Sequence, residues 1–298
     1  MVFMKLTPCL VFRARQLSRL ALVVLAVAVL SACGVVWGKS SDSKAADAKA
    51  KGADTKSSGK SNAANAAPWN AAILQAIGLF PEGGRYSTGK DAFDALQNAV
   101  HWEDDRPALR PKVATPSFCS GGTYVAFLVM LAQQQFDGKL SLTPDVWRAL
   151  MVDNQHDGEG VWGRWNANGP GTARLFFETG AGRNFTDWSQ AQAGDFLKIF
   201  WNEFIGSQES GHSVIFIGVE KQESEEMVTF WSSNQPEGYG VKSVPRSKIK
   251  RAVFSRLETP NKLSAVLKMP RQDDFLTSLQ QTAAKPEDAA KMVGIKEW

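Results

Sequence analysis

The spacing of apolar residues changes along the chain, and this change constrains the fold more than any other feature. Between residues 69 and 179 apolar side chains recur at helical spacing, whereas from residue 195 they fall in short β-branched or aromatic runs. Helices followed by strands predict an α+β fold with an antiparallel sheet of at least four strands. The expected helices cover 69–80, 91–102, 143–151, 172–179 and about 273–281, with a further helix that begins at Cys119. The expected strands cover 195–201, 213–220, 227–231 and 251–257.

The first 32 residues have the composition of a bacterial export signal. Basic residues precede an apolar run from residue 20 to residue 30, which is too short to span a bilayer comfortably. The run ends in Leu-Ser-Ala followed by Cys33, which resembles the lipobox of bacterial lipoproteins. That resemblance implies that residues 1–32 are removed and that Cys33 is lipidated. An ordinary signal peptide that leaves Cys33 free is the alternative.

Residues 33–67 are expected to form a disordered tether behind the lipidated Cys33. From residue 39 the segment contains almost only Lys, Ser, Ala, Asp, Gly and Asn, so it cannot bury enough apolar surface to offset its conformational entropy. Its lysines outnumber its aspartates. The segment therefore acts either as the basic half of a two-part membrane anchor or as a solvated spacer.

The rest of the chain is long enough for one domain with a substantial core, expected at 68–260, followed by a C-terminal helix and tail at 261–298. The net charge of +4 lies partly in the signal and tether, so it indicates no nucleic-acid partner. We expect a monomer without metal or other cofactor. Cys9 leaves with the signal and Cys33 carries lipid, so Cys119 is the single thiol of the exported domain. A lone thiol in an oxidising compartment favours a chemical use for it.

Cys119 stands at the predicted start of a helix whose apolar residues recur at Tyr124, Phe127, Leu128 and Leu131. A thiol there meets the positive end of the helix dipole and backbone N–H groups that lack intrahelical partners. Both favour the thiolate, which is the nucleophilic form. The alternative is a small core residue.

Two later segments add a base and an amide. Gly194-Asp195 opens one predicted strand, His212 opens the next, and Asn234 follows a third. With Cys119, this order resembles the papain-like bacterial cell-wall peptidases and amidases of the CHAP and NlpC groups. The resemblance covers about residues 117–254 and implies that Cys119 is the nucleophile, His212 the base and Asn234 the amide that orients the base.

The sequence departs from that family pattern in two places. The interval between Cys119 and His212 is longer than expected, and Ser232 stands where the CHAP pattern usually has Glu. The third catalytic position is therefore open among Asn234, Ser232 and Gln235.

Residues 153–171 are expected to form a long loop that lines a substrate groove, because Trp faces and polar side chains gather there. An ordinary surface loop is the alternative. The residues expected to bind substrate are Ser120, Trp162, Arg164, Trp165, Asn166, Trp231, Ser232 and Gln235.

Three other patterns carry no predicted function. Residues 84–91 have the spacing of a phosphate-binding loop, but Asp91 stands where Ser or Thr binds magnesium and no strand precedes the loop. The acidic cluster after His101 is expected to be a solvated helix end. The residues around His156 match no metal-ligand spacing.

These expectations combine into a lipid-anchored thiol hydrolase of the cell envelope that cleaves an amide or peptide bond, with peptidoglycan as the expected substrate. In a Gram-negative cell, Gly34 after the lipidated cysteine favours the outer membrane, facing the periplasm. One alternative is a non-catalytic lipoprotein that binds peptidoglycan or protein in the same groove. Another is acyl transfer to an acceptor other than water.

Overall fold

The computed structural model describes residues 68–298, so the predicted signal, lipidated Cys33 and tether lie outside the described residues. The described part is an α+β fold whose main sheet has seven strands in the order β1-β8-β7-β6-β5-β9-β4, each antiparallel to its neighbours. No helix within 68–298 is long and apolar enough to cross a membrane.

Each of the four predicted strands is present, and the structure adds others. The predicted ones correspond to β5 (Phe196–Phe200), β6 (Gly211–Gln222), β7 (Glu225–Asn234) and β9 (Arg251–Leu257). The added strands of the main sheet are β1 (Gly83–Gly84), β4 (Gly182–Phe185) and β8 (Gly238–Pro245). A separate hairpin consists of β2 (Val100–Glu103) and β3 (Arg106–Leu109).

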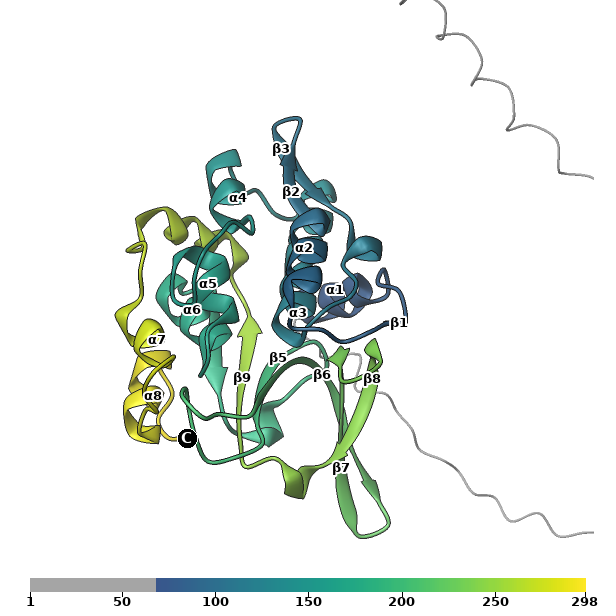
Figure 1. Cartoon of the computed structure of the whole chain (residues 1–298), viewed down its shortest axis with the longest axis vertical. Coiled ribbons are helices and arrows are strands. Elements are labelled where there is room, and N and C mark those ends of the chain that lie inside the picture. Colours follow the sequence, from purple (N-terminus) through teal and green to yellow (C-terminus); the bar gives the residue numbers. More distant parts are fainter. Residues whose placement is uncertain (1–67) are drawn as a thin grey trace, which may run out of the picture. The chain divides into compact units, whose positions relative to one another are not determined.

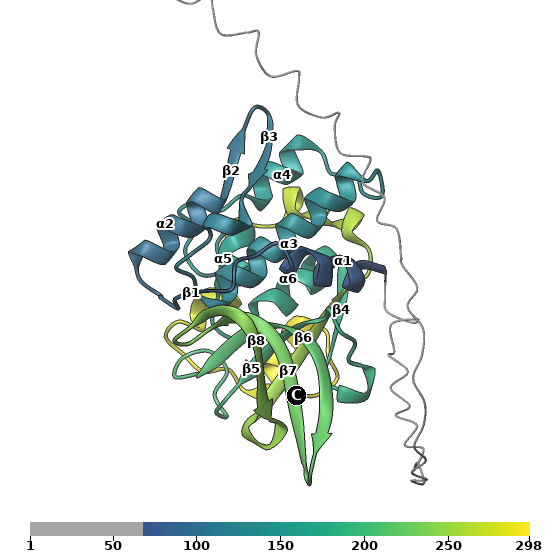
Figure 2. The same cartoon turned by 90° about the vertical axis from the view of Figure 1, so that its right-hand side faces the viewer.

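The helices are α1 (Pro68–Ile77), α2 (Lys90–Ala99), α3 (Cys119–Phe136), α4 (Pro144–Leu150), α5 (Gly160–Asn166), α6 (Gly171–Thr179), α7 (Asp274–Ser278) and α8 (Pro286–Val293). Helices α1 to α6 gather at one end of the main sheet, whereas α7 and α8 lie along its side (Figures 1 and 2). Two predictions of local structure are wrong. The helix expected to reach residue 102 ends at Ala99, because Val100 turns extended and starts β2. The acidic cluster after His101 therefore lies in the β2–β3 hairpin and not at a helix end. The loop expected at 153–171 contains α5.

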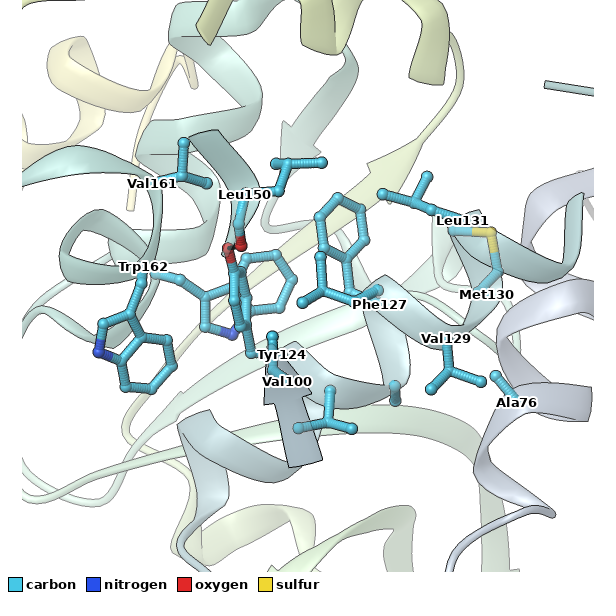
Figure 3. Packing of buried hydrophobic residues seen from close by; sticks show 14 of the residues in the cluster. Ala76, Val100, Tyr124, Phe127, Val129, Met130, Leu131, Leu150, Val161 and Trp162 are labelled. Atoms are coloured by element: carbon cyan, nitrogen blue, oxygen red, sulfur yellow. Dashed lines mark hydrogen bonds between the residues drawn. The ribbon is translucent and has the colours of Figure 1, made fainter. Parts of the chain in front are cut away.

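Helix α3 is the centre of the core. The sequence predicted one buried stripe, but α3 is buried on all sides from Ser120 to Leu131. The stretch is mostly apolar, and its polar members Ser120 and Thr123 are hydrogen-bonded. Tyr124 and Phe127 pack with aromatic residues of α5, and the hydroxyl of Tyr124 donates to the carbonyl of Leu150 at 2.6 Å (Figure 3). Because α3 also packs on β6 and β7, its first residue is held against the sheet.

The Gly194-Asp195 pair before β5 has a structural role. Gly194 has a φ of +92°, and a Cβ there would lie 2.4 Å from the carbonyl oxygen of Asn70. The wholly buried Asp195 carboxylate accepts two hydrogen bonds from Arg256, at 2.7 and 2.6 Å, and one from the Asn70 amide at 2.8 Å. This bidentate pair ties the entry of β5 to β9 and α1.

The C-terminal residues pack on the same body. Leu263 belongs to the core cluster that contains α3. Arg174 on α6 donates to the carbonyl of Met292 at 2.8 Å, and Asn184 on β4 donates to that of Val293 at 2.9 Å. Residues 261–298 therefore contribute to the core.

Candidate active site

Cys119 is the first residue of α3, as predicted. Phe118 before it is extended and gives the helix no side-chain cap. The start of the helix is fixed from two sides: the Ser117 hydroxyl donates to Ser233 on β7 at 2.8 Å, and the Ser117 N–H donates to the carbonyl of Arg85 at 3.1 Å. Cys119, the one free cysteine among residues 68–298, is partly exposed there.

His212 and Asn234 lie side by side on β6 and β7. His212 Nε2 is 3.1 Å from Asn234 Oδ1. The Asn234 amide nitrogen donates to the carbonyls of Ser232 and Gly240, at 3.0 and 2.9 Å, so its oxygen must be the atom that faces the ring. Since that oxygen can only accept, Nε2 carries a proton, and Nδ1 is left as the basic nitrogen of the neutral ring.

The His212 side chain interacts with the thiol of Cys119 and changes its pKa. Burial raises the pKa of the Cys119 thiol, but the hydrogen bond and the charge of His212 lower it, with smaller contributions from the Ser213 backbone N–H and the charge of Lys198. The net pKa is about 6. A group with this pKa is mostly thiolate at neutral pH and is protonated as the pH falls through 6.

Tyr86 is a member of the site that the sequence did not indicate. A parallel bridge between Tyr86 and Ser117 places the half-buried phenol beside Cys119. Burial raises the pKa of Tyr86 to about 12, helped by the charge of Cys119 and a hydrogen bond with it. The phenol therefore stays protonated and serves as a donor to the sulfur. Its segment resembled only a defective phosphate-binding loop, so no local pattern marked it.

Cys119 opens on a cavity of about 890 Å³. Three predicted substrate-binding residues, Ser120, Trp162 and Asn166, line it. The Ser120 hydroxyl donates to Asn166 at 2.7 Å, and the Asn166 amide donates to Asp157 at 2.8 Å. Burial raises the pKa of Asp157, while Asn166 and the charge of Lys198 oppose the shift. Ser120, Asn166 and Asp157 thus form a hydrogen-bonded row of polar side chains along the cavity that begins next to Cys119.

Arg164 and Trp165 do not line the cavity, contrary to prediction. Arg164 is fully buried, pairs with Glu178 at 2.8 Å and donates to four backbone carbonyls. Trp165 stacks on Phe127 with ring centroids 5.0 Å apart and donates to Thr123. In α5 the residues at 161, 162, 164 and 165 are all buried, so this segment supplies packing as well as one cavity wall.

Three further residues predicted to bind substrate, Trp231, Ser232 and Gln235, also lie away from the cavity. Trp231 is buried between Phe80 and Tyr239, and the Ser232 hydroxyl donates to the Ser213 carbonyl at 2.7 Å. Gln235 is exposed beyond the strand. Only Asn234, of the three candidates for the orienting residue, bonds to the His212 ring.

Lys198 and Glu209 line the cavity as well, and neither was predicted from the sequence. Lys198 interrupts the apolar strand Phe-Leu-Lys-Ile-Phe, and a lone cation in such a run was a usable signal. Across residues 68–298 no group of three or more His, Cys, Asp or Glu side chains is arranged to hold a metal ion.

Comparison of the chain with protein-family models, curated proteins and solved structures gives no significant match.

Proposed function

We propose that this protein is a thiol hydrolase of amide or peptide bonds with a papain-like catalytic domain. The observation that carries the proposal is the Cys119, His212 and Asn234 arrangement, in which the amide orients the ring, the ring lowers the pKa of the thiol to about 6, and the thiol opens on a cavity. A structural cysteine has no need of an oriented base.

The chemistry follows from these positions. The Cys119 thiolate attacks the scissile carbonyl carbon, and protonated His212 gives its Nδ1 proton to the leaving nitrogen as the C–N bond breaks. The resulting thioester is cleaved by water, which loses a proton to His212; the carboxylic acid leaves, and the Cys119 thiolate is restored beside protonated His212. The Cys119 backbone N–H and the Tyr86 hydroxyl are suited to stabilise the oxyanion of each tetrahedral intermediate.

The substrate and location rest on the sequence. The lipobox-like end of the signal, the lipidated Cys33 that it implies and the resemblance to CHAP and NlpC enzymes support a lipid-anchored monomer in the cell envelope, at the outer membrane if the cell is Gram-negative. The same features support peptidoglycan as the substrate. The polar cavity suits a peptide chain better than a purely apolar ligand.

Digestion of purified peptidoglycan tests this function. The full-length protein should release new peptide or sugar-peptide fragments, detected by mass spectrometry, and Cys119→Ala should release none. Unchanged peptidoglycan together with rapid alkylation of Cys119 would redirect the proposal to another amide substrate or to acyl transfer. Unchanged peptidoglycan together with a thiol that is inert until denaturation would contradict it and favour a binding lipoprotein.

Tyr86→Phe is expected to lower kcat by about tenfold to a hundredfold with a small change in KM, because it removes one donor to the oxyanion while keeping the ring. The steady-state kinetics of amide cleavage measure this. Tyr124→Phe is a matched control, since its buried hydroxyl bonds to Leu150 away from the cavity. Equal effects of the two variants on kcat, after correction for folded fraction, would remove Tyr86 from the reaction.

A further inference from the structure

Lys198 is a partly buried cation in the wall of the cavity. It lies in the middle of β5, directly across from Ser213 on β6, and its side chain is 15% exposed. Lys198 and Ser213 line the cavity together with Cys119, and the charge of Lys198 contributes to lowering the pKa of that thiol. The ammonium therefore lies near the reacting atom.

Lys198 is held in place by Glu209. The ammonium is 2.7 Å from Glu209 Oε1, while Glu209 Oε2 accepts from the backbone N–H groups of Gly169 and Gly206 at 2.5 and 2.7 Å. Glu209 is thus satisfied by three donors. The ammonium has three N–H donors, and this is its one hydrogen bond to the described residues, so two donors remain for a ligand.

The approach to Lys198 from the cavity is kept open by a glycine. Gly211 also lines the cavity, and a Cβ at this position would lie 2.8 Å from both the Lys198 nitrogen and Glu209 Oε1. Two other acidic groups interact with the ammonium: the Cys119 thiolate and the Asp157 carboxyl group. The charge of Lys198 lowers the pKa of Asp157, but burial raises it by more. Asp157 already bonds to Asn166.

We propose that Lys198 binds a carboxylate carried by the substrate close to the scissile bond. This inference rests on the proposed thiol hydrolase function and names its substrate class: acidic peptides, or peptides that end near the cleaved bond. A partly buried ammonium with unused donors binds a carboxylate strongly, because the charge-assisted hydrogen bonds form away from bulk water. Lys198 is in this account a specificity residue that contacts substrate.

Pairs of thiol reagents that differ only in charge test the inference without a known substrate. Iodoacetate is compared with iodoacetamide, and bromoacetylglycine with bromoacetylglycinamide. In each reaction the thiolate displaces halide and forms an S–C bond. Rates are measured on the full-length chain at about pH 8.5, where Cys119 is fully ionised, and the labelled residue is identified by peptide mapping.

Lys198→Met is expected to lower the ratio of the alkylation rate with the acid reagent to that with its amide by about tenfold, in at least one of the two reagent pairs. An effect of this size needs only a modest part of the attraction between two opposite charges in a half-buried site. Lys198→Arg should retain most of the ratio. The double variant Lys198→Met/Glu209→Gln, which leaves no unpaired carboxylate, should lose it like the single one. Lys90→Met is the control, because Lys90 also lines the cavity but pairs with Asp94 in solvent.

An unchanged ratio in both Lys198→Met variants would overturn the inference and leave Lys198 as a partner of Glu209 alone, with the proposed hydrolase intact. A Cys119 that reacts with none of the reagents in the folded wild-type protein would overturn the proposed function, and this inference with it.

Discussion

Replacing His212 with Ala should lower the rate of amide cleavage by about a thousandfold or more, because it removes both the proton donor for the leaving group and the group that sustains the thiolate. Without its partner, the partly buried thiol should have a pKa at or above the ordinary 8.5. The midpoint of the pH dependence of alkylation by iodoacetamide should then move upwards from about 6.

Alkylation at about pH 6.5 should fall less than turnover does, by about tenfold. The thiolate fraction drops by roughly two orders of magnitude, but the remaining thiolate is the more basic and hence the stronger nucleophile. His156→Ala is the matched control, since His156 lines the cavity on which Cys119 opens but is not among the groups that lower the pKa of the thiol. Wild-type turnover in the His212 variant would show that another group is the base.

Replacing Arg256 with Met should destabilise the protein by about 3 to 5 kcal/mol, since it leaves the Asp195 carboxylate in the core without its bidentate partner. The free energy of unfolding in urea measures the loss. A loss of this size can leave little folded protein at room temperature.

Arg183→Met is the control for that experiment. Arg183 pairs with Glu258 at 2.7 Å, but both side chains are about two-fifths exposed, so the loss should stay within about 1 kcal/mol. Similar decreases in the free energy of unfolding for the two variants would mean that burial of the Asp195–Arg256 pair does not increase its contribution to stability.

The candidate triad could be predicted from the sequence because each of its members stands at the end of a regular element. Cys119 begins a helix, His212 is the second residue of β6 and Asn234 is the last of β7. Short loops join antiparallel neighbours, so the positions of His212 and Asn234 on adjacent strands followed from local patterns.

The cavity walls could not be predicted in the same way. A Trp or Arg in a polar segment can line a groove or be buried in the core, and only the tertiary packing determines which of the two occurs. Trp162 lines the cavity, whereas Trp165 and Arg164 turn into the body around α5. Tyr86 reaches the thiol through a bridge to Ser117, a contact between distant segments that carries no local signature.

The Gly194-Asp195 pair stands at the entry of a strand, as the sequence predicted, and its role there is structural. The resemblance placed Gly194 and Asp195 among the family elements, and their contacts explain why a strand entry has this composition. The glycine allows close approach to Asn70, and the aspartate anchors Arg256. These contacts tie the entry of β5 to β9 and α1, and β5 in turn pairs with β6, which carries His212.

The central claim is that His212 keeps Cys119 ionised at neutral pH. The ultraviolet absorbance of the thiolate, recorded against pH for the wild-type chain and corrected with Cys119→Ala, measures this ionisation directly. The expected midpoint is about 6, and it should rise in the His212→Ala variant. A midpoint above 8 in the wild-type protein, unmoved by loss of the imidazole, would contradict the claim.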